Sequence, residues 1–111
     1  MKLIIAIVQD EDASRLVNQL MKNGYGVTKL ATTGGFLRAG NTTLLIGVDD
    51  EKLKAVMDII EHVCKSRKQM TSAPSTMGAM GGMASAASYP VEVTVGGATV
   101  FVLTVDQFVK L

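Results

Sequence analysis

Hydrophobic and polar residues follow two kinds of pattern in the first part of the chain. Residues 3–8 form a continuous aliphatic run whose length and composition predict a β-strand. A second segment follows this strand. Gly24 or Gly26 can end it, because glycine readily adopts the left-handed conformation at a helix C-terminus. Within that segment apolar residues lie three and four positions apart, which predicts an amphipathic helix whose inward face is Ala13, Leu16, Val17, Leu20 and Met21.

The middle of the chain repeats this order. Residues 27–32 and 42–48 predict two strands separated by a glycine-containing turn. Acidic residues at 10–12 and 49–51 stand where helices are expected to begin, and negative charge there complements the helix dipole. The second helix has the same three- and four-residue spacing, with Leu53, Val56, Met57, Ile60 and Val63 on one face. The repetition predicts two related halves, each built from a strand, an acidic turn and a helix.

Two further segments complete the expected architecture. Residues 70–89, MTSAPSTMGAMGGMASAASY, contain no charge and four of the seven methionines, a composition that favours a long flexible loop. Residues 91–95 and 98–105 predict a β-hairpin joined by a two-residue Gly-Gly turn. Short connections and right-handed crossovers then favour an α+β fold, a ferredoxin-like βαββαβ sandwich with an added hairpin strand, in a single domain spanning residues 1–111.

The predicted strands carry apolar residues on both of their alternating faces. Strands of this kind are normally covered on both sides, whereas two helices can cover only one face of the sheet. The other face needs a partner. Self-association through this face is the simplest solution, and it would create clefts between subunits.

Charge and composition narrow the function classes. Eleven Lys and Arg residues against ten Asp and Glu residues give a net charge of +1, which offers no electrostatic basis for nonspecific binding to nucleic acid or to membranes. The N-terminal apolar run lacks the features of a signal peptide, and no segment approaches membrane-spanning length. The single cysteine, Cys64, excludes an internal disulfide framework and suits a reducing compartment. We therefore expect a cytoplasmic protein.

Candidate catalytic or metal-binding groups are scarce. His62 and Cys64 share a helix but are two positions apart, so they point in different directions and make a poor base and nucleophile pair. The two acidic clusters are better explained by the helix starts than by a metal site. These residues therefore give no support for a catalytic or a metal site, and we expect neither.

The segment at residues 33–48, TGGFLRAGNTTLLIGV, is the best candidate for ligand contact. From Gly35 it has the spacing of a P-loop, but Asn41 replaces the lysine and a strand, not a helix, follows. The glycines still allow close backbone approach, Phe36 offers a stacking face, and the Asn41 amide can both donate and accept hydrogen bonds. An ordinary β-turn with a buried Phe is equally compatible with these residues.

Three stretches resemble one known family. The run TKLATTGGFLRAGNTT, the opening IIAIVQD and the closing YPVEVTVGGATVFVLTVDQF are similar to the PII-like cyclic-di-AMP receptor proteins, the PstA/DarA family. The similarity covers nearly the whole chain and is weakest over the helices and the Met-rich loop. Members are homotrimers of ferredoxin-like subunits without known catalytic activity that bind cyclic di-AMP in clefts between subunits. The resemblance therefore implies a signal-transduction receptor.

The resemblance also implies specific ligand contacts. Thr28 would contact a phosphate, Phe36 with Leu37 would pack on or beside an adenine, and Asn41 would read an adenine edge. Gly47 would offer main-chain hydrogen bonds, and Phe101 would supply an apolar wall from the adjacent subunit. The loop between the second and third strands and the loop at 70–89 would flank the cleft, order on binding and present a new surface to a downstream protein. The expected ligand-binding set is Thr28, Gly35, Phe36, Leu37, Arg38, Asn41, Gly47 and Phe101.

The chain departs from the family just before the Thr-Lys-Leu motif. Relatives often carry Asn and Arg where this chain has Gly24 and Gly26, so a polar and a cationic contact are expected to be missing, and Arg38 or Lys29 would have to compensate. Two other functions stay open. A PII-type sensor of ATP and ADP is disfavoured by the short loop between the second and third strands, and a weak nucleotide phosphohydrolase lacks a supporting carboxylate or histidine motif.

Overall fold

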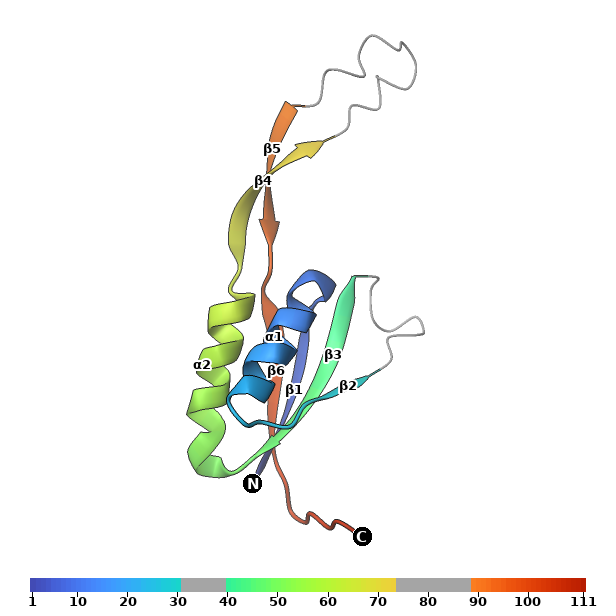
Figure 1. Cartoon of the computed structure of the whole chain (residues 1–111), viewed down its shortest axis with the longest axis vertical. Coiled ribbons are helices and arrows are strands. Elements are labelled where there is room, and N and C mark those ends of the chain that lie inside the picture. Colours follow the sequence, from blue (N-terminus) through green and yellow to red (C-terminus); the bar gives the residue numbers. More distant parts are fainter. Residues whose placement is uncertain (31–39, 74–88) are drawn as a thin grey trace. The chain divides into compact units, whose positions relative to one another are not determined.

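The structure is a computed structural model that describes residues 1–30, 40–73 and 89–111. The chain forms two compact units (Figure 1). Met1–Lys65 and Gly96–Leu111 make up the first, which we call the sheet–helix unit. Ser66–Val95 make up the second, which we call the ribbon unit.

The sheet–helix unit contains one antiparallel sheet and two main helices. The strand order is β2-β3-β1-β6, and each neighbouring pair is antiparallel. This α+β arrangement is compatible with a ferredoxin-like fold, as the repeated strand and helix pattern predicts. In chain order the elements are β1 (Lys2–Gln9), α1 (Asp10–Lys22), β2 (Thr28–Leu30), β3 (Asn41–Val48), a short 3-10 helix (Asp50–Lys52), α2 (Leu53–Cys64) and β6 (Ala98–Thr104).

The core lies between the helices and one face of this sheet. Alternate residues of β1 face it, and they pair with alternate residues of β3, as Ile4 does with Ile46 and Ala6 with Leu44. Both helices pack on this same face because their buried residues belong to one cluster with these strands. The helices contribute Ala13, Leu16, Leu20, Val56, Ile60, Val63 and Cys64 to that cluster.

The predicted inward face of α1 is correct except at its last residue. Ala13, Leu16 and Leu20 are buried, whereas Met21 is 62% exposed. Met21 lies one position after Leu20 and is therefore rotated about 100° around the helix axis from it. It falls outside the stripe that the sheet covers.

Gly24 ends α1 in a Schellman motif. Its amide donates to the Met21 carbonyl at 3.0 Å, and the Tyr25 amide donates to the Leu20 carbonyl at 2.9 Å. Gly24 has a φ of +87°, the left-handed conformation that this motif requires. Of the two glycines that the sequence offers as helix ends, Gly24 is the one used.

Polar contacts of Arg15 connect the first half of α1 to the end of α2. The Arg15 guanidinium donates to the Val63 carbonyl at 2.8 Å and lies 3.6 Å from the Asp12 carboxylate. Asp12 is only 1% exposed, and a buried carboxylate needs such partners to offset its desolvation. The acidic cluster at the start of α1 thus has a structural use beyond its favourable position at the helix dipole.

The ribbon unit corrects the prediction of a loop at 70–89. β4 (Arg67–Ala73) pairs antiparallel with β5 (Tyr89–Val95), so residues 70–73 and 89 belong to strands. Lys68 and Glu92 form an ion pair at 3.3 Å across this ribbon. The prediction failed because β4 is mostly polar, and its strand conformation depends on pairing with β5 rather than on its own pattern. The remainder of the predicted loop lies outside the described residues.

The predicted hairpin across Gly96 and Gly97 is wrong. β5 pairs with β4, and β6 pairs with β1. Both glycines have positive φ, which suits a hairpin turn, but the Gly97 amide donates to the Cys64 carbonyl instead of closing such a turn. Long-range pairing of β6 with the apolar strand β1 therefore outweighs the local turn preference.

The burial pattern of α1 predicts very different effects at two adjacent positions. Leu20→Ala should lower the free energy of unfolding by about 2–5 kcal/mol because Leu20 is fully buried. The adjacent control Met21→Ala should change it by less than about 0.5 kcal/mol because Met21 is mostly exposed. Urea denaturation of both variants measures the difference, and equal losses would contradict this packing of α1.

Candidate functional site

A continuous row of side chains crosses the sheet on the face opposite the helices. Phe101 of β6 pairs with Ile5 of β1, and Ile5 pairs with Leu45 of β3. Leu45 in turn pairs with Thr28 of β2. Directly opposed residues on neighbouring strands project to the same side of a sheet. The row therefore runs from one edge strand to the other.

Neighbouring positions extend this row into a larger surface, which we call the open face. It is partly apolar and accessible, since Phe101 is 52%, Leu103 45% and Leu30 40% exposed. Both helices pack on the other side of the sheet, as the sequence predicts for strands with two apolar faces. Besides the row, the open face comprises Leu3, Ile7, Gln9, Leu30, Asn41, Thr43, Gly47, Thr99 and Leu103.

Four of the eight sequence-predicted site residues lie on the open face. Thr28 and Phe101 end the central row on opposite edges of the sheet, and Asn41 and Gly47 lie at the two ends of β3. The other four, at positions 35–38, lie outside the described residues.

These four positions are well separated within one chain. Three strand spacings separate Thr28 from Phe101, which is about 14 Å. Six residues of strand separate Asn41 from Gly47, which is about 20 Å. One chain therefore spreads these groups over a surface and does not gather them around a single pocket.

A hollow of about 280 Å³ lies beside Gly47, near the C-terminal end of β3. Gly24, Gly26 and Gly47 all contribute to its wall, as do Tyr25 and Lys52. A Cβ atom at Gly24 or Gly26 would meet no atom within 4 Å, so the space beside both glycines is open. The hollow thus lies beside Gly24 and Gly26, the two positions at which we expect a departure from the family that the sequence resembles.

The sequence patterns did not identify Tyr25, Asp49 or Lys52 as part of this hollow. The only signal for them was their proximity to Gly26 and Gly47. Met1 also lines the hollow, and its α-ammonium group lies 2.9 Å from the Asp50 carboxylate. This hydrogen bond with the ammonium group holds the pKa of Asp50 below its usual value.

Hydrogen bonds of the two neighbouring residues, Gly40 and Thr42, fix the position of Asn41. The Asp10 amide donates to the Gly40 carbonyl at 2.8 Å, and the Thr42 hydroxyl donates to the Asp10 carboxylate. Gly40 has a φ of +97° and so turns the chain into β3. Because a strand begins at Asn41, this segment lacks the helix N-terminus that binds phosphate in a P-loop.

The burial and spacing of Cys64, His62 and the acidic clusters bear on whether these residues could form a reactive or metal site. Cys64 is 1% exposed, whereas His62 on the same helix faces solvent. Among residues 1–30, 40–73 and 89–111, no three His, Cys, Asp or Glu side chains lie close enough together to hold a metal ion. No described helix combines the length and apolar character needed to cross a membrane.

Comparison with known proteins identifies the family of this chain. The model of the cyclic-di-AMP receptor family matches residues 1–111, the whole chain. This chain belongs to the cyclic-di-AMP receptor family. It is also similar to a solved structure described as a functionally unknown protein from Pediococcus pentosaceus, with 44% identity and a TM-score of 0.78 over 99% of this chain and 96% of that one.

Family membership confirms the resemblance and gives the open face a chemical context. Cyclic di-AMP presents two adenine rings, each with a flat apolar face and a polar edge, and two phosphodiesters. The aromatic ring of Phe101, the Asn41 amide and the Thr28 hydroxyl match these three kinds of group. The family thus supports binding of the second messenger.

Two glycines of the hollow should respond oppositely to the same substitution. Gly24→Ala should lower the free energy of unfolding by about 1–2 kcal/mol because its φ of +87° strains any residue with a Cβ atom. Gly26→Ala should leave stability unchanged or raise it by up to about 1 kcal/mol, because it restricts the unfolded chain and has open space beside it. Thermal and urea unfolding test the pair, and equal destabilisation would contradict the Schellman assignment.

Proposed function

We propose that the protein is a non-enzymatic signal-transduction receptor that binds cyclic di-AMP at the subunit interfaces of a homotrimer. The single observation that carries this proposal is the distribution of Thr28, Asn41, Gly47 and Phe101 over the open face, too far apart to surround one base within a chain. A second copy packed near this face would bring its own residues close to them. The family resemblance supports the trimeric state.

In the proposed complex each group has a separate role. The Thr28 hydroxyl donates to a phosphate oxygen, and the Asn41 amide pairs with an adenine edge. Phe101 of a neighbouring subunit covers an adenine face. Gly47 offers main-chain hydrogen bonds beside the hollow that also contains Gly24 and Gly26.

The segment at 31–39 would complete the site. Gly35 would allow close backbone approach, Phe36 and Leu37 would pack against an adenine, and Arg38 would add positive charge near the phosphates. Ligand capture would order this segment and the Met-rich segment before β5, provided that the ligand binds the ordered state more tightly. The changed surface would then be recognised by a downstream protein.

Several related inferences rest on the same proposal. The whole chain would act as a single ligand-binding domain, with neither cofactor nor metal, in the cytoplasm. Cyclic di-AMP would bind without being hydrolysed. A sensor of ATP or ADP and a phosphohydrolase would each give a different result in the calorimetric test below.

The proposed role of Asn41 predicts a change in ligand specificity. Asn41→Ala should weaken cyclic di-AMP about tenfold or more, because base-edge groups lose a hydrogen-bond partner. The affinity gap between cyclic di-AMP and cyclic di-GMP should narrow accordingly. Isothermal titration calorimetry with both dinucleotides measures this gap, and Asn18→Ala, at an exposed position of α1, is the matched control.

Two results would contradict this assignment. If Asn41→Ala and Asn18→Ala bind both dinucleotides like the parent, Asn41 does not read the base. Tighter binding of ATP or ADP than of cyclic di-AMP, or release of a hydrolysis product during the titration, would instead favour one of the other functions.

The proposed assembly predicts that charge on the open face disrupts the trimer. Leu103→Glu should yield monomers, because an interfacial carboxylate would be buried without a partner. Val102→Glu is the matched control. Val102 precedes Leu103 and is similarly exposed, at 43% compared with 45% for Leu103. It pairs with Ile4, however, and so projects to the helix-covered face. Light scattering after size-exclusion chromatography should show a trimer for Val102→Glu. A parent protein that is already monomeric at micromolar concentration would contradict the proposed trimer.

A further inference from the structure

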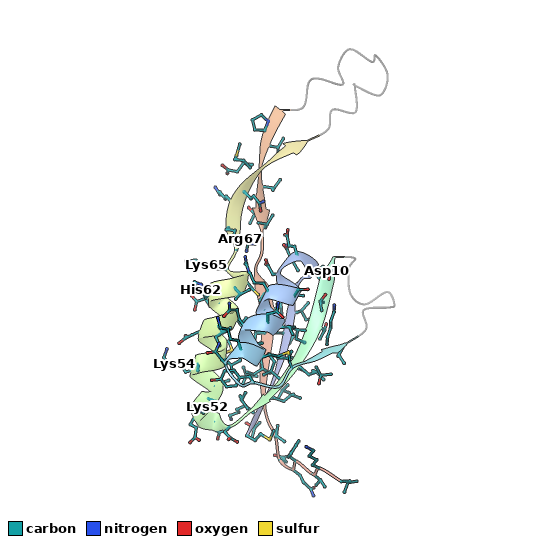
Figure 2. The ribbon with its side chains drawn as sticks, in the orientation of Figure 1. Asp10, Lys52, Lys54, His62, Lys65 and Arg67 are labelled. Atoms are coloured by element: carbon teal, nitrogen blue, oxygen red, sulfur yellow. The ribbon has the colours of Figure 1, made fainter. Side chains whose placement is uncertain are left out.

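Gln9 and Asp10 each bond to a glycine of the sheet–helix unit that is distant in sequence. The Asp10 amide donates to the carbonyl of Gly40, the residue that follows segment 31–39. The side-chain oxygen of Gln9 accepts a hydrogen bond from the Gly96 amide at 2.8 Å. Gly96 is the first residue of the sheet–helix unit after the ribbon unit. Figure 2 shows Asp10 at the same end of this unit as His62 and Lys65 of the α2 terminus.

The Gln9 side chain supplies a hydrogen-bond acceptor at a place where strand pairing supplies none. Pairing between β1 and β6 ends at Val8 and Ala98. The preceding glycines turn away from the sheet with φ values of +84° and +89°, so their amides need other acceptors. The Cys64 carbonyl accepts from Gly97, and the Gln9 Oε1 atom accepts from Gly96.

Helix capping does not explain this orientation of Gln9. Gln9 occupies the N-cap position of α1, where a side-chain oxygen commonly accepts a backbone hydrogen bond from the first helical turn. Its side chain makes no such bond. It reaches instead to Gly96, which is 87 residues away in the sequence.

Gln9 is also the cross-strand partner of Asn41 at the end of the open face. Asn41 is the residue proposed above to read an adenine edge. The residue after Asn41 is Thr42, whose hydroxyl donates a hydrogen bond to the carboxylate of Asp10, the residue next to Gln9. The first residues of β3 are therefore connected through Gln9 and Asp10 to the point where β6 begins.

We infer that Gln9 is a positioning residue that couples ligand contact at Asn41 to the glycine junction at Gly96 and Gly97. This inference rests on the proposed function. When a ligand base fixes Asn41, it also restricts the paired Gln9, whose side-chain oxygen then holds the Gly96 amide more persistently. Cyclic di-AMP thereby stabilises the junction through which the ribbon unit is connected to β6, without touching that junction. Coupling of this kind requires only that the ligand favour the state in which the Gln9 contact is formed.

Amide hydrogen exchange at Gly96 and Gly97, measured by NMR, tests this coupling. In the parent, saturating cyclic di-AMP should slow exchange at Gly96 about two- to tenfold, the range for one net hydrogen bond. Gln9→Met keeps the side-chain length but removes the oxygen, so the ligand should change Gly96 exchange by less than about 1.5-fold. Gln9→Glu retains an acceptor oxygen and should restore the ligand effect. Gln19→Met, at an exposed position of α1, should behave like the parent.

The possible outcomes separate this inference from the proposed function. Calorimetry on the same samples reports whether cyclic di-AMP binds. Binding without slower exchange at Gly96 in the parent would overturn the coupling alone, as would an undiminished ligand effect in Gln9→Met. Failure of the parent to bind cyclic di-AMP would overturn both. A merely structural role for Gln9 would lower the stability of Gln9→Met but leave the ligand effect on Gly96 intact.

Discussion

The uncovered face of the four-stranded sheet is the constraint on which the other features depend. Two helices bury one side of the sheet and leave Phe101, Leu103 and Leu30 between 40% and 52% exposed on the other. Burying the remaining half of each side chain would stabilise an assembly by about 1 kcal/mol apiece. Association itself costs at least about 4 kcal/mol, so these three residues alone are insufficient. A stable partner must cover the central row of the open face as well as its edge.

The same constraint links assembly to recognition. The polar groups of Thr28 and Asn41 lie on the open face, together with the aromatic ring of Phe101. These groups lie on three strands across the width of the sheet, and in the proposed receptor a second chain adds the residues that complete the site. In the proposed receptor, subunit packing and ligand binding therefore use neighbouring parts of one surface. The contacts of Gln9 and Asp10 would then connect this surface to the junction at Gly96.

Much of the sheet–helix unit could be predicted from periodicity, because α1, α2, β1 and β3 each carry a strong apolar pattern that matches their burial. The uncovered face followed from the same pattern. β4 could not be predicted in this way, since its strand conformation is imposed by pairing with β5. The Gly-Gly pair was misassigned as a hairpin turn because sequence alone does not reveal that β6 pairs with β1.

The candidate site was only partly accessible to sequence reasoning. The family resemblance predicts ligand contacts at Thr28, Asn41, Gly47 and Phe101, and these four residues lie on the open face. The contribution of Tyr25 and Lys52 to the hollow depends on how the chain leaves α1 and enters α2. The Gln9 contact joins residues 87 positions apart, a separation at which no local pattern gives a signal.

The central claim is that a second copy of the chain completes the ligand site. Sedimentation velocity recorded at 260 nm tests it directly, because it follows the ligand. The chain contains no Trp and only two Tyr residues, and the adenine rings therefore dominate the absorbance. Cyclic di-AMP should sediment with a species of three chains, at about one ligand per chain as expected for equivalent interfaces in a closed ring. Ligand sedimenting with a single chain would contradict the claim, since the site would then be complete without a partner.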